Sequence, residues 1–386
     1  MDYNNKPAST SRRCRLYFFM ILLPSFLSLL GTEVALAQAP TYTYVDGSSL
    51  RVFGMASTVP EGSYRRLAKE QLDSLPERLQ QLALNTAGIH LDFRTDSRSI
   101  SVKWELDEFR ELYNMTPVAV NGLDLYGYRD GKWQFVGVAR PEGRENSAVL
   151  IRNLDGQLRN YRLYLPLYTG VKKLQLGVEE GSEISKSDPA LIPSSRVLIY
   201  GSSITQGASA SRPGMAFPAL LSRGLNAEFL NFGFSGSGKM EPEVARILAG
   251  LETDLIILDC VANPSPQQIR ERSLPFILEL RQSRPEVPIV MLEAVVRETA
   301  HWDLQWQEKA TAQNRAFREA YQQLIQMGVD NLFYIPGEGL TGTDHEATVD
   351  GTHFTDLGHF RIAEALLPRL EKLLNDLKQK QPQKQQ

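Results

Sequence analysis

The chain has 386 residues, of which 42% are hydrophobic and 23% charged, and its formal net charge is −3. This length is enough for two domains, and this composition is that of a soluble globular protein rather than a fibrous or disordered one. A mildly acidic chain without a basic cluster is also a poor candidate for binding nucleic acid, so we exclude that class of function.

Residues 1–37 show the order of features that is typical of a secretory signal peptide. Arg12, Arg13 and Arg15 precede an apolar run from Leu16 to Leu30, and "ALA" at 35–37 is a small-residue cleavage pattern. The run is short and interrupted by a proline, which makes it a poor membrane span. We expect it to be cleaved, leaving no stable membrane span, and an uncleaved anchor is the alternative. Cleavage removes four basic and two acidic residues, which leaves a net charge of −5. We therefore expect a secreted or periplasmic protein.

Residues 41–185 predict a β-sandwich or jelly-roll domain, because many short segments alternate apolar and polar residues between turn signals. The expected strands lie in 88–95, 99–106, 118–139, 160–167 and 172–178, and the turn signals are Asn121-Gly122, Asp130-Gly131 and Asp155-Gly156. One helix is expected within 64–83. The polar segment 178–195 predicts a linker to the next domain.

Residues 194–378 follow a different pattern, in which continuous apolar strands alternate with helices. The expected strands are 197–200, 227–232, 255–259, 288–292 and 332–335, and the expected helices are 216–225, 241–251, 266–281, 303–327 and 355–378. Right-handed βα units of this kind predict an α/β fold, a three-layer α/β/α sandwich with a five-stranded parallel sheet. Residues 379–386 lack apolar side chains and predict a disordered tail.

The first strand of this second domain ends at Gly201-Ser202-Ser203, where a parallel α/β sheet places its ligands. A serine hydroxyl is a weak nucleophile and needs an imidazole base, a group that orients the base, and donors for the oxyanion. Asp350 stands three residues before His353 in a predicted loop, a spacing that lets the carboxylate bind Nδ1 and leave Nε2 free. We therefore expect Ser203, His353 and Asp350 to act together. Ser203 as a mere helix N-cap and Asp350 as a turn former are the alternatives.

The remaining histidines are weaker candidates for the base. His345 with Asp344 is a competitor, but the pair lacks the loop spacing. His90 lies in an alternating strand and is expected to be structural, His301 opens a long helix, and His359 falls inside a helix as a packed or capping residue.

Four motifs together resemble those of the SGNH or GDSL hydrolases. They are "GSSITQG" (201–207), "NFGFSGSG" (231–238), "DCVANPSP" (259–266) and "DGTHFTDLGH" (350–359), in the order in which the family carries them. The resemblance implies that Ser203 is the nucleophile, with Ser202 in place of the family's aspartate. It also implies that Gly236 and Asn263 join the Ser203 amide in an oxyanion hole, and that Asp350 orients His353. Val261 and Pro264 stand where the family has glycine and aspartate.

Each motif residue has an ordinary alternative. Ser202 could be the nucleophile instead, and Asn263 and Gly236 could be turn residues. Glu293 could line the pocket or form an ion pair. Cys260 is left without a partner once Cys14 is removed with the signal, which predicts no disulfide and favours a small core residue. No cluster has metal-ligand spacing, so we expect no metal and no cofactor.

The expected function is that of a secreted serine esterase that removes acyl groups, acetyl groups above all, from carbohydrate. The β-rich domain, which resembles one that precedes the hydrolase domain in a secreted bacterial branch of the family, suits a polysaccharide substrate. The alternatives are a lipase, thioesterase or other short-acyl hydrolase, and a catalytically inactive carbohydrate-binding protein. Trp104, Tyr126, Tyr128 and Trp133 could stack against sugars, but their strand spacing favours a place in the core.

Overall fold

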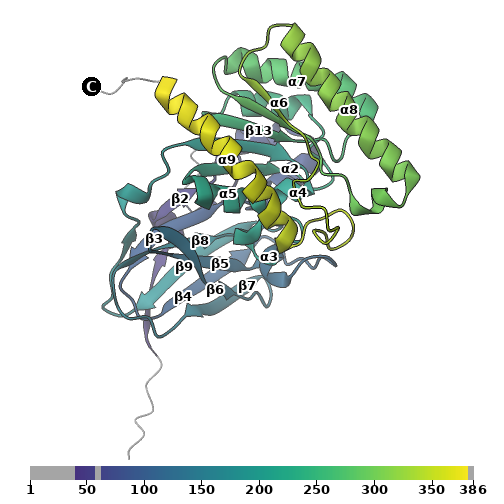
Figure 1. Ribbon diagram of the computed structural model, residues 1–386. Coiled ribbons are helices and arrows are strands. Elements are labelled where there is room, and N and C mark those ends of the chain that lie inside the picture. Colours follow the sequence, from purple (N-terminus) through teal and green to yellow (C-terminus); the bar gives the residue numbers. More distant parts are fainter. Residues whose placement is uncertain (1–39, 57–61, 381–386) are drawn as a thin grey trace, which may run out of the picture. The chain divides into compact units, whose positions relative to one another are not determined.

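The β-rich part of the molecule consists of two antiparallel sheets. The computed structural model describes residues 40–56 and 62–380 (Figure 1), so the signal peptide predicted at 1–37 lies outside the described residues. One sheet has the order β1 (Tyr42–Asp46), β9 (Val171–Glu179), β4 (Ile100–Leu106), β7 (Glu145–Ile151). The other has the order β10 (Ile184–Lys186), β3 (His90–Thr95), β8 (Arg159–Tyr164), β5 (Leu123–Arg129), β6 (Lys132–Ala139), with β2 (Arg51–Phe53) paired to β3.

The two sheets bury one apolar core between them. Leu91 and Leu163 of the second sheet meet Val102 and Leu176 of the first in the same cluster of buried side chains. The predicted Asp130-Gly131 turn is confirmed: both residues have positive φ, 53° and 77°, and join β5 to β6 as a two-residue hairpin loop. Such a loop twists in the sense that a right-handed β-ribbon requires.

Four local predictions in this part and at the end of the chain need correction. The helix expected within 64–83 is two short helices, α1 (Lys69–Asp73) and α2 (Glu77–Ala83), separated near a proline. Residues 118–121, expected as strand, belong to helix α3 (Pro117–Asn121), which is capped by Thr116. The expected linker contains β10. Gln379 and Lys380 are not in a tail but end helix α9 (Asp356–Lys380), because both residues have good helix propensity and the next proline comes only at position 382; the rest of the predicted tail, 381–386, lies outside the described residues.

The α/β part is built on the predicted five-stranded parallel sheet. Its order is β12 (Glu228–Gly233), β11 (Arg196–Gly201), β13 (Leu255–Asp259), β14 (Ile289–Leu292), β15 (Leu332–Ile335). Helices α6 (Pro242–Ala249), α7 (Pro266–Ser283) and α8 (Leu304–Gln326) cover one face, and α5 (Phe217–Leu225) and α9 cover the other (Figure 1). Along β11, Leu198 and Tyr200 point to the face covered by α6, α7 and α8, and Val197 and Ile199 point to the face covered by α5 and α9. This alternation produces the predicted three layers.

The two parts are joined by buried contacts. Arg66, which is 1% exposed, donates from Nη1 to the carbonyls of Asn231 (2.9 Å) and Gly233 (2.8 Å). Those carbonyls belong to β12, the edge strand of the parallel sheet, so the guanidinium satisfies acceptors that no neighbouring strand reaches. Leu79 and Leu82 of α2 lie in the same apolar cluster as Leu230 of β12. The β-rich segment around α2 therefore completes the core of the α/β part.

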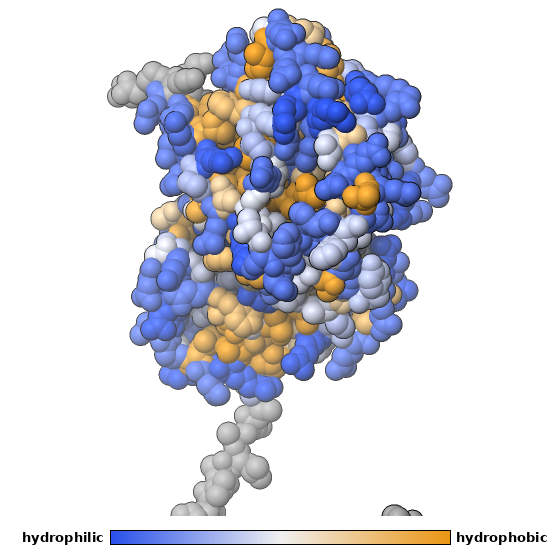
Figure 2. Space-filling view, turned by 45° about the vertical axis from the view of Figure 1, so that its right-hand side comes forward, coloured by the Kyte–Doolittle hydropathy of each residue, from blue (hydrophilic) through white to orange (hydrophobic). Residues whose placement is uncertain are grey.

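On the face that Figure 2 shows, an apolar area lies over the β-rich part, and hydrophilic residues with smaller apolar patches between them cover the α/β part. Among the helices that the structure describes, none has both the length and the apolar composition needed to cross a bilayer.

Candidate active site

A cleft of about 390 Å³ lies where the parallel strands end. The loops after β11, β12, β13, β14 and β15 all contribute to its walls, as expected for a parallel α/β sheet. Its lining residues are Tyr113, Ser202, Ser203, Ile204, Ser235, Gly236, Ala262, Asn263, Arg297, Asp350, Thr352 and His353. The predicted site residues Ser203, Gly236, Asn263, Asp350 and His353 are all among them.

Three of these side chains form a continuous hydrogen-bonded chain. Ser203 Oγ lies 3.0 Å from His353 Nε2, and His353 Nδ1 lies 2.8 Å from Asp350 Oδ2. The carboxylate accepts from the Nδ1 hydrogen, so Nε2 is left as the acceptor for the serine proton. The imidazole and carboxyl side chains are only 23% and 20% exposed, which shields this chain from bulk water.

The start of helix α4 (Ser203–Gln206) separates the roles of the two neighbouring serines. Ser202 is the N-cap, and its side chain accepts a hydrogen bond from Ile204 N at 3.2 Å. Ser203 is the first helical residue and turns its hydroxyl toward His353. The helix is braced by Thr205, whose hydroxyl donates to Asp259 Oδ2 at 2.6 Å. Burial raises the pKa of Asp259 to about 7, although the Thr205 hydrogen bond opposes this.

The two predicted oxyanion donors follow the next two strands. Gly236 has φ of +71°, a conformation that favours glycine, and it opens onto the cleft. Asn263 Nδ2 donates one hydrogen to Ser237 O at 2.6 Å. A side-chain amide has two N–H donors, so the second stays available to a ligand in the cleft.

Several donors converge on Asp350. Its Oδ1 accepts from the backbone N–H groups of His353 (2.8 Å) and Thr352 (3.0 Å). Partial burial raises the pKa of Asp350, but these hydrogen bonds and the His353 side chain outweigh it and bring that pKa to about 2. The carboxylate is therefore ionised at neutral pH and holds the imidazole in one orientation.

Sequence reasoning missed two residues of the β-rich part that reach this carboxylate. Asn114 Nδ2 lies 3.2 Å from Asp350 Oδ2 and 3.4 Å from His353 Nδ1. The Tyr113 hydroxyl lies 3.3 Å from Asp350 Oδ2. Because Nδ1 carries the hydrogen that Asp350 accepts, the Asn114 amide donates to the carboxylate. No local pattern marks these residues, which lie in an irregular loop between β4 and α3.

Arg297 was also missed. It follows β14, donates from Nη2 to Ala262 O at 3.2 Å, and stacks its guanidinium over Trp306 at 4.5 Å. A charged residue in a loop after a strand gives no sign, in sequence, that it faces the cleft. It supplies a positive charge to the same cleft that Asp350 lines.

The other candidate residues lie away from the cleft lining. Asp344 pairs with Arg361, and His345 contacts Glu298 instead of Asp344. His90 and Cys260 are buried, as expected of structural residues. Glu293 is 4% exposed and accepts from Arg318 (2.6 Å) and from the Tyr334 hydroxyl, which makes it an ion-pair residue.

His359 is a packed residue. It is fully buried in α9, where Nε2 donates to Ala208 O at 3.0 Å and Nδ1 accepts from Phe217 N at 3.3 Å. Both ring nitrogens of the neutral imidazole are thus satisfied. Burial lowers the pKa of His359 to about 4.

The four aromatic residues do not form one platform. Trp104 and Tyr126 are buried in the β-rich part, as their strand spacing favoured. Tyr128 and Trp133 meet edge to face with centroids 5.2 Å apart, and the Arg162 guanidinium lies 4.4 Å from the Trp133 centroid. The Arg162 guanidinium therefore covers a face of the Trp133 ring, whereas the half-buried Tyr128 lines a separate cavity of about 420 Å³.

Comparisons with known proteins agree with this architecture. Residues 194–371 match the model of the GDSL-like lipase/acylhydrolase family, and residues 42–184 match the model described as the N-terminus of SGNH-hydrolase-type esterases. A Bacteroides ovatus protein described as a GDSL-like lipase is 42% identical, with a TM-score of 0.83 over 87% of this chain and 98% of its own. No curated protein sequence matches the chain.

Two more distant structures share the fold. A salicylyl-acyltransferase from a tetracycline biosynthetic pathway is 20% identical, with a TM-score of 0.71 over 87% of this chain and 98% of its own. An acetyl xylan esterase from the rumen bacterium Butyrivibrio proteoclasticus is 14% identical, with a TM-score of 0.57 over 86% and 99%. The identity and coverage of the Bacteroides ovatus protein, together with the matched family models, show that this chain belongs to the GDSL-like lipase/acylhydrolase family of SGNH-type hydrolases.

Proposed function

We propose that the protein is a serine esterase that removes acetyl groups from carbohydrate, with Ser203, His353 and Asp350 as its catalytic triad. The observation that carries the proposal is the hydrogen-bonded chain from Ser203 Oγ through His353 to Asp350 at the wall of a cleft. A hydroxyl, an imidazole and a carboxylate in this order are the requirements of nucleophilic acyl transfer.

The chemistry follows from these contacts. His353 Nε2 takes the Ser203 proton as Oγ attacks the ester carbonyl, and the resulting imidazolium is stabilised by Asp350. The oxyanion would be held by the backbone N–H groups of Ser203 and Gly236 and by the second amide hydrogen of Asn263. The bond from carbon to the alcohol oxygen then breaks, and His353 returns its proton to the alcohol. Water, deprotonated by the same imidazole, then attacks the acyl carbonyl, the bond from carbon to Ser203 Oγ breaks, and His353 returns the proton to Oγ as the acid leaves.

The cleft lining supports a short acyl group and a polar alcohol. Most of its lining residues are polar or charged, and the apolar ones, Ile204 and Ala262, offer no extended surface for a fatty acyl chain. Arg297, Thr352 and the Tyr113 hydroxyl are suited to hydrogen bonds with sugar hydroxyls. An acetyl xylan esterase of the same fold is consistent with this substrate class.

The experiment compares substrates and variants. We expect rapid hydrolysis of p-nitrophenyl acetate, weak hydrolysis of long-chain p-nitrophenyl esters, and release of acetate from acetylated xylan. Ser203→Ala should abolish all three activities, whereas Ser202→Ala should retain measurable turnover because it removes only the helix cap. Preference for long-chain esters would favour a lipase, and unchanged activity in Ser203→Ala would eliminate the mechanism.

We also propose that the protein acts outside the cytoplasm and has two domains, with boundaries near 41–185 and 194–378. The basic flank, apolar run and small-residue motif of residues 1–37 support export. Mass spectrometry of the protein recovered from an expressing bacterium tests this, since export predicts a mature N-terminus near Gln38. An intact N-terminus would support the uncleaved anchor instead.

A further inference from the structure

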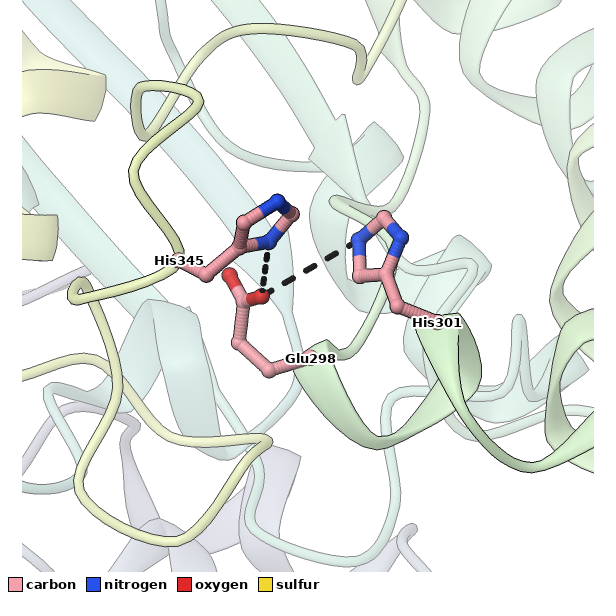
Figure 3. Close-up of side chains that lie close together, drawn as sticks. All are labelled: Glu298, His301 and His345. Carbon is pink, nitrogen blue, oxygen red and sulfur yellow. Dashed lines mark hydrogen bonds and ion pairs between the residues drawn. The ribbon is translucent and has the colours of Figure 1, made fainter.

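A cluster of two histidines and a glutamate lies beside the loop that carries Asp350 and His353. Glu298 and His301 are three positions apart on η4 (Glu298–His301), and the geometry of a 3-10 helix places such positions on the same side. His345 comes from the loop between β15 and α9. Figure 3 shows both imidazole rings turning a nitrogen toward one oxygen of the Glu298 carboxylate.

The three potential ligand atoms lie close enough together to share one metal ion. Glu298 Oε2 lies 2.7 Å from His345 Nδ1 and 3.9 Å from His301 Nε2, and all three atoms lie within 4.8 Å of one another. Zinc bonds of about 2.0–2.1 Å place tetrahedral ligand atoms roughly 3.3 Å apart. Small side-chain rotations would therefore bring the three atoms to one ion.

We propose that Glu298, His301 and His345 bind a divalent first-row transition metal ion, with Zn²⁺ as the best match. Two imidazoles and a carboxylate suit zinc, whereas magnesium and calcium prefer sites made of oxygen ligands. The His301 and His345 side chains are 45% and 58% exposed, so an ion can enter from solvent and keep a water molecule as a further ligand.

The sequence predicts no such site because its ligands come from two segments that are far apart in the chain, the η4 turn and the loop between β15 and α9. Only Glu298 and His301 have a local spacing, and a single Glu-x-x-His pair on a short turn carries little information. The backbone of His345 adopts a positive φ of 63°, which is uncommon for a residue with a side chain. This conformation, which sequence does not reveal, accompanies the approach of His345 to the turn.

The bound ion would fix the loop that bears the base. Glu298 N already donates to Gly351 O at 2.9 Å, and Val349 N donates to His353 O at 2.9 Å across the loop. A metal joining Glu298 and His301 to His345 would add a second attachment between the η4 turn and this loop. Any effect on hydrolysis rests on the proposed function, whereas metal binding does not.

Binding is tested on the full chain produced without a histidine tag, stripped with a chelator and titrated with ZnCl₂ by calorimetry. We expect one equivalent to bind and to raise the melting temperature. His301→Ala, His345→Ala and Glu298→Gln should each weaken zinc affinity about tenfold or more. Glu346→Gln is the matched control, because it removes an exposed carboxylate one residue from His345 and should bind zinc like the unaltered protein.

Hydrogen exchange of residues 343–353 provides a readout that is independent of activity. Zinc should slow exchange in this loop in the unaltered protein and in Glu346→Gln, but not in His345→Ala. The proposal is overturned if no zinc binds or if affinity survives all three ligand substitutions, and bound zinc that leaves exchange in the loop unchanged would overturn the claim that the ion fixes this loop. The first two results would identify the cluster as an ordinary ion-pair network.

Discussion

At the scale of single residues, neighbouring polar groups of the site have different roles: some form hydrogen bonds within the protein, and others face the cleft. Ser202 caps a helix, and Ser203 faces the imidazole one residue later. The side-chain amide of Asn263 has two hydrogens. One is donated to Ser237 O, and the other can be donated to a ligand in the cleft. His353 and His359 lie on the same segment, but only His353 reaches the cleft lining.

Asn263→Ala is expected to lower kcat by about 10²–10³-fold, since it removes one oxyanion donor. The effect on KM should be small, because the donor acts mainly on charge that develops in the transition state. Asn263→Asp has nearly the same shape but replaces the donor with an acceptor, and it should be at least as inactive. Steady-state kinetics on p-nitrophenyl acetate measure both, and an active Asn263→Asp variant would remove Asn263 from the oxyanion hole.

His359 is expected to make the protein less stable in mild acid. Its folded pKa of about 4 lies below the ordinary value of 6.5, so the unfolded chain binds a proton that the folded chain does not. Stability should therefore fall as the pH drops from about 6.5 to 4, by up to about 3 kcal/mol from this residue, and no further below pH 4. Asp356 opposes this shift in pKa, and the positive charge of protonated His353 adds to it.

The measurement is the free energy of unfolding in urea, for the unaltered protein and for His359→Gln, between pH 4 and 8. Buried His90 also has a lowered pKa and contributes to the same window, so the difference between the two proteins isolates His359. The difference in free energy of unfolding between the unaltered protein and His359→Gln should be constant above pH 6.5 and become smaller below pH 6.5. A difference that is independent of pH throughout would contradict the account of His359.

At the scale of elements, the loop between β4 and α3 extends the β-rich part into the candidate active site. Asn114 and Tyr113 both lie within hydrogen-bond distance of Asp350 Oδ2, the oxygen that accepts from His353 Nδ1. The loop thus helps to orient a carboxylate that belongs to the other part of the chain. Asn114 is a positioning residue, since it touches the orienting group and not the reacting atoms.

Asn114→Ala is expected to lower kcat by about tenfold, in line with the loss of a hydrogen bond to a charged group. The melting temperature should hardly change, because the side chain is not buried. Tyr113→Phe keeps the ring at the cleft and removes a longer hydrogen bond, so its effect should be smaller. Kinetics and differential scanning calorimetry together check this, and an equal loss of kcat and stability would indicate a merely structural role.

The sequence predicted the helices and strands that have a strong local hydrophobic pattern. It missed elements that depend on capping residues or on pairing with a distant strand. The strand 255–259 and the strand 332–335 match β13 and β15 residue for residue, because each is a short apolar run between breakers. Helix α3 was missed because Val118 and Val120 resemble a strand, although Thr116 and Pro117 are a cap and a first-turn proline. β10 is only three residues long and carries a single apolar residue, Ile184, and it forms because its backbone pairs with the edge of β3.

The same distinction applies to the site. Ser203, Gly236, Asn263 and His353 follow strands or open a helix, where local motifs carry their positions. Asn114 and the Glu298–His345 contact depend on loops brought together by the whole fold, so no spacing in the chain reveals them.

At the scale of the whole molecule, the β-rich and α/β parts pack into one compact unit from Pro40 onward. Arg66 is the clearest link, because its buried guanidinium serves the carbonyls of Asn231, Gly233 and Leu82. Burial lowers the pKa of Arg66 to about 9, and the Phe234 ring lies 4.9 Å from its guanidinium carbon. Loss of this side chain would leave several buried acceptors without donors.

Arg66→Met is expected to destabilise the protein by about 3 kcal/mol or more, because unsatisfied buried carbonyls are costly. Arg65→Met is the matched control, since the neighbouring arginine is exposed and its loss should change stability little. Calorimetry should show a single unfolding transition in the unaltered protein. Two separate transitions, or equal stability of the two variants, would contradict a shared core.

The central claim, that His353 activates the Ser203 hydroxyl, is tested most directly by covalent labelling. Diisopropyl fluorophosphate should add one phosphoryl group per chain, and mass spectrometry of proteolytic peptides should locate it on Ser203. His353→Ala should slow the labelling sharply, and Ser203→Ala should abolish it together with hydrolysis. An active protein that takes up no label, or a label that persists in Ser203→Ala, would contradict the account.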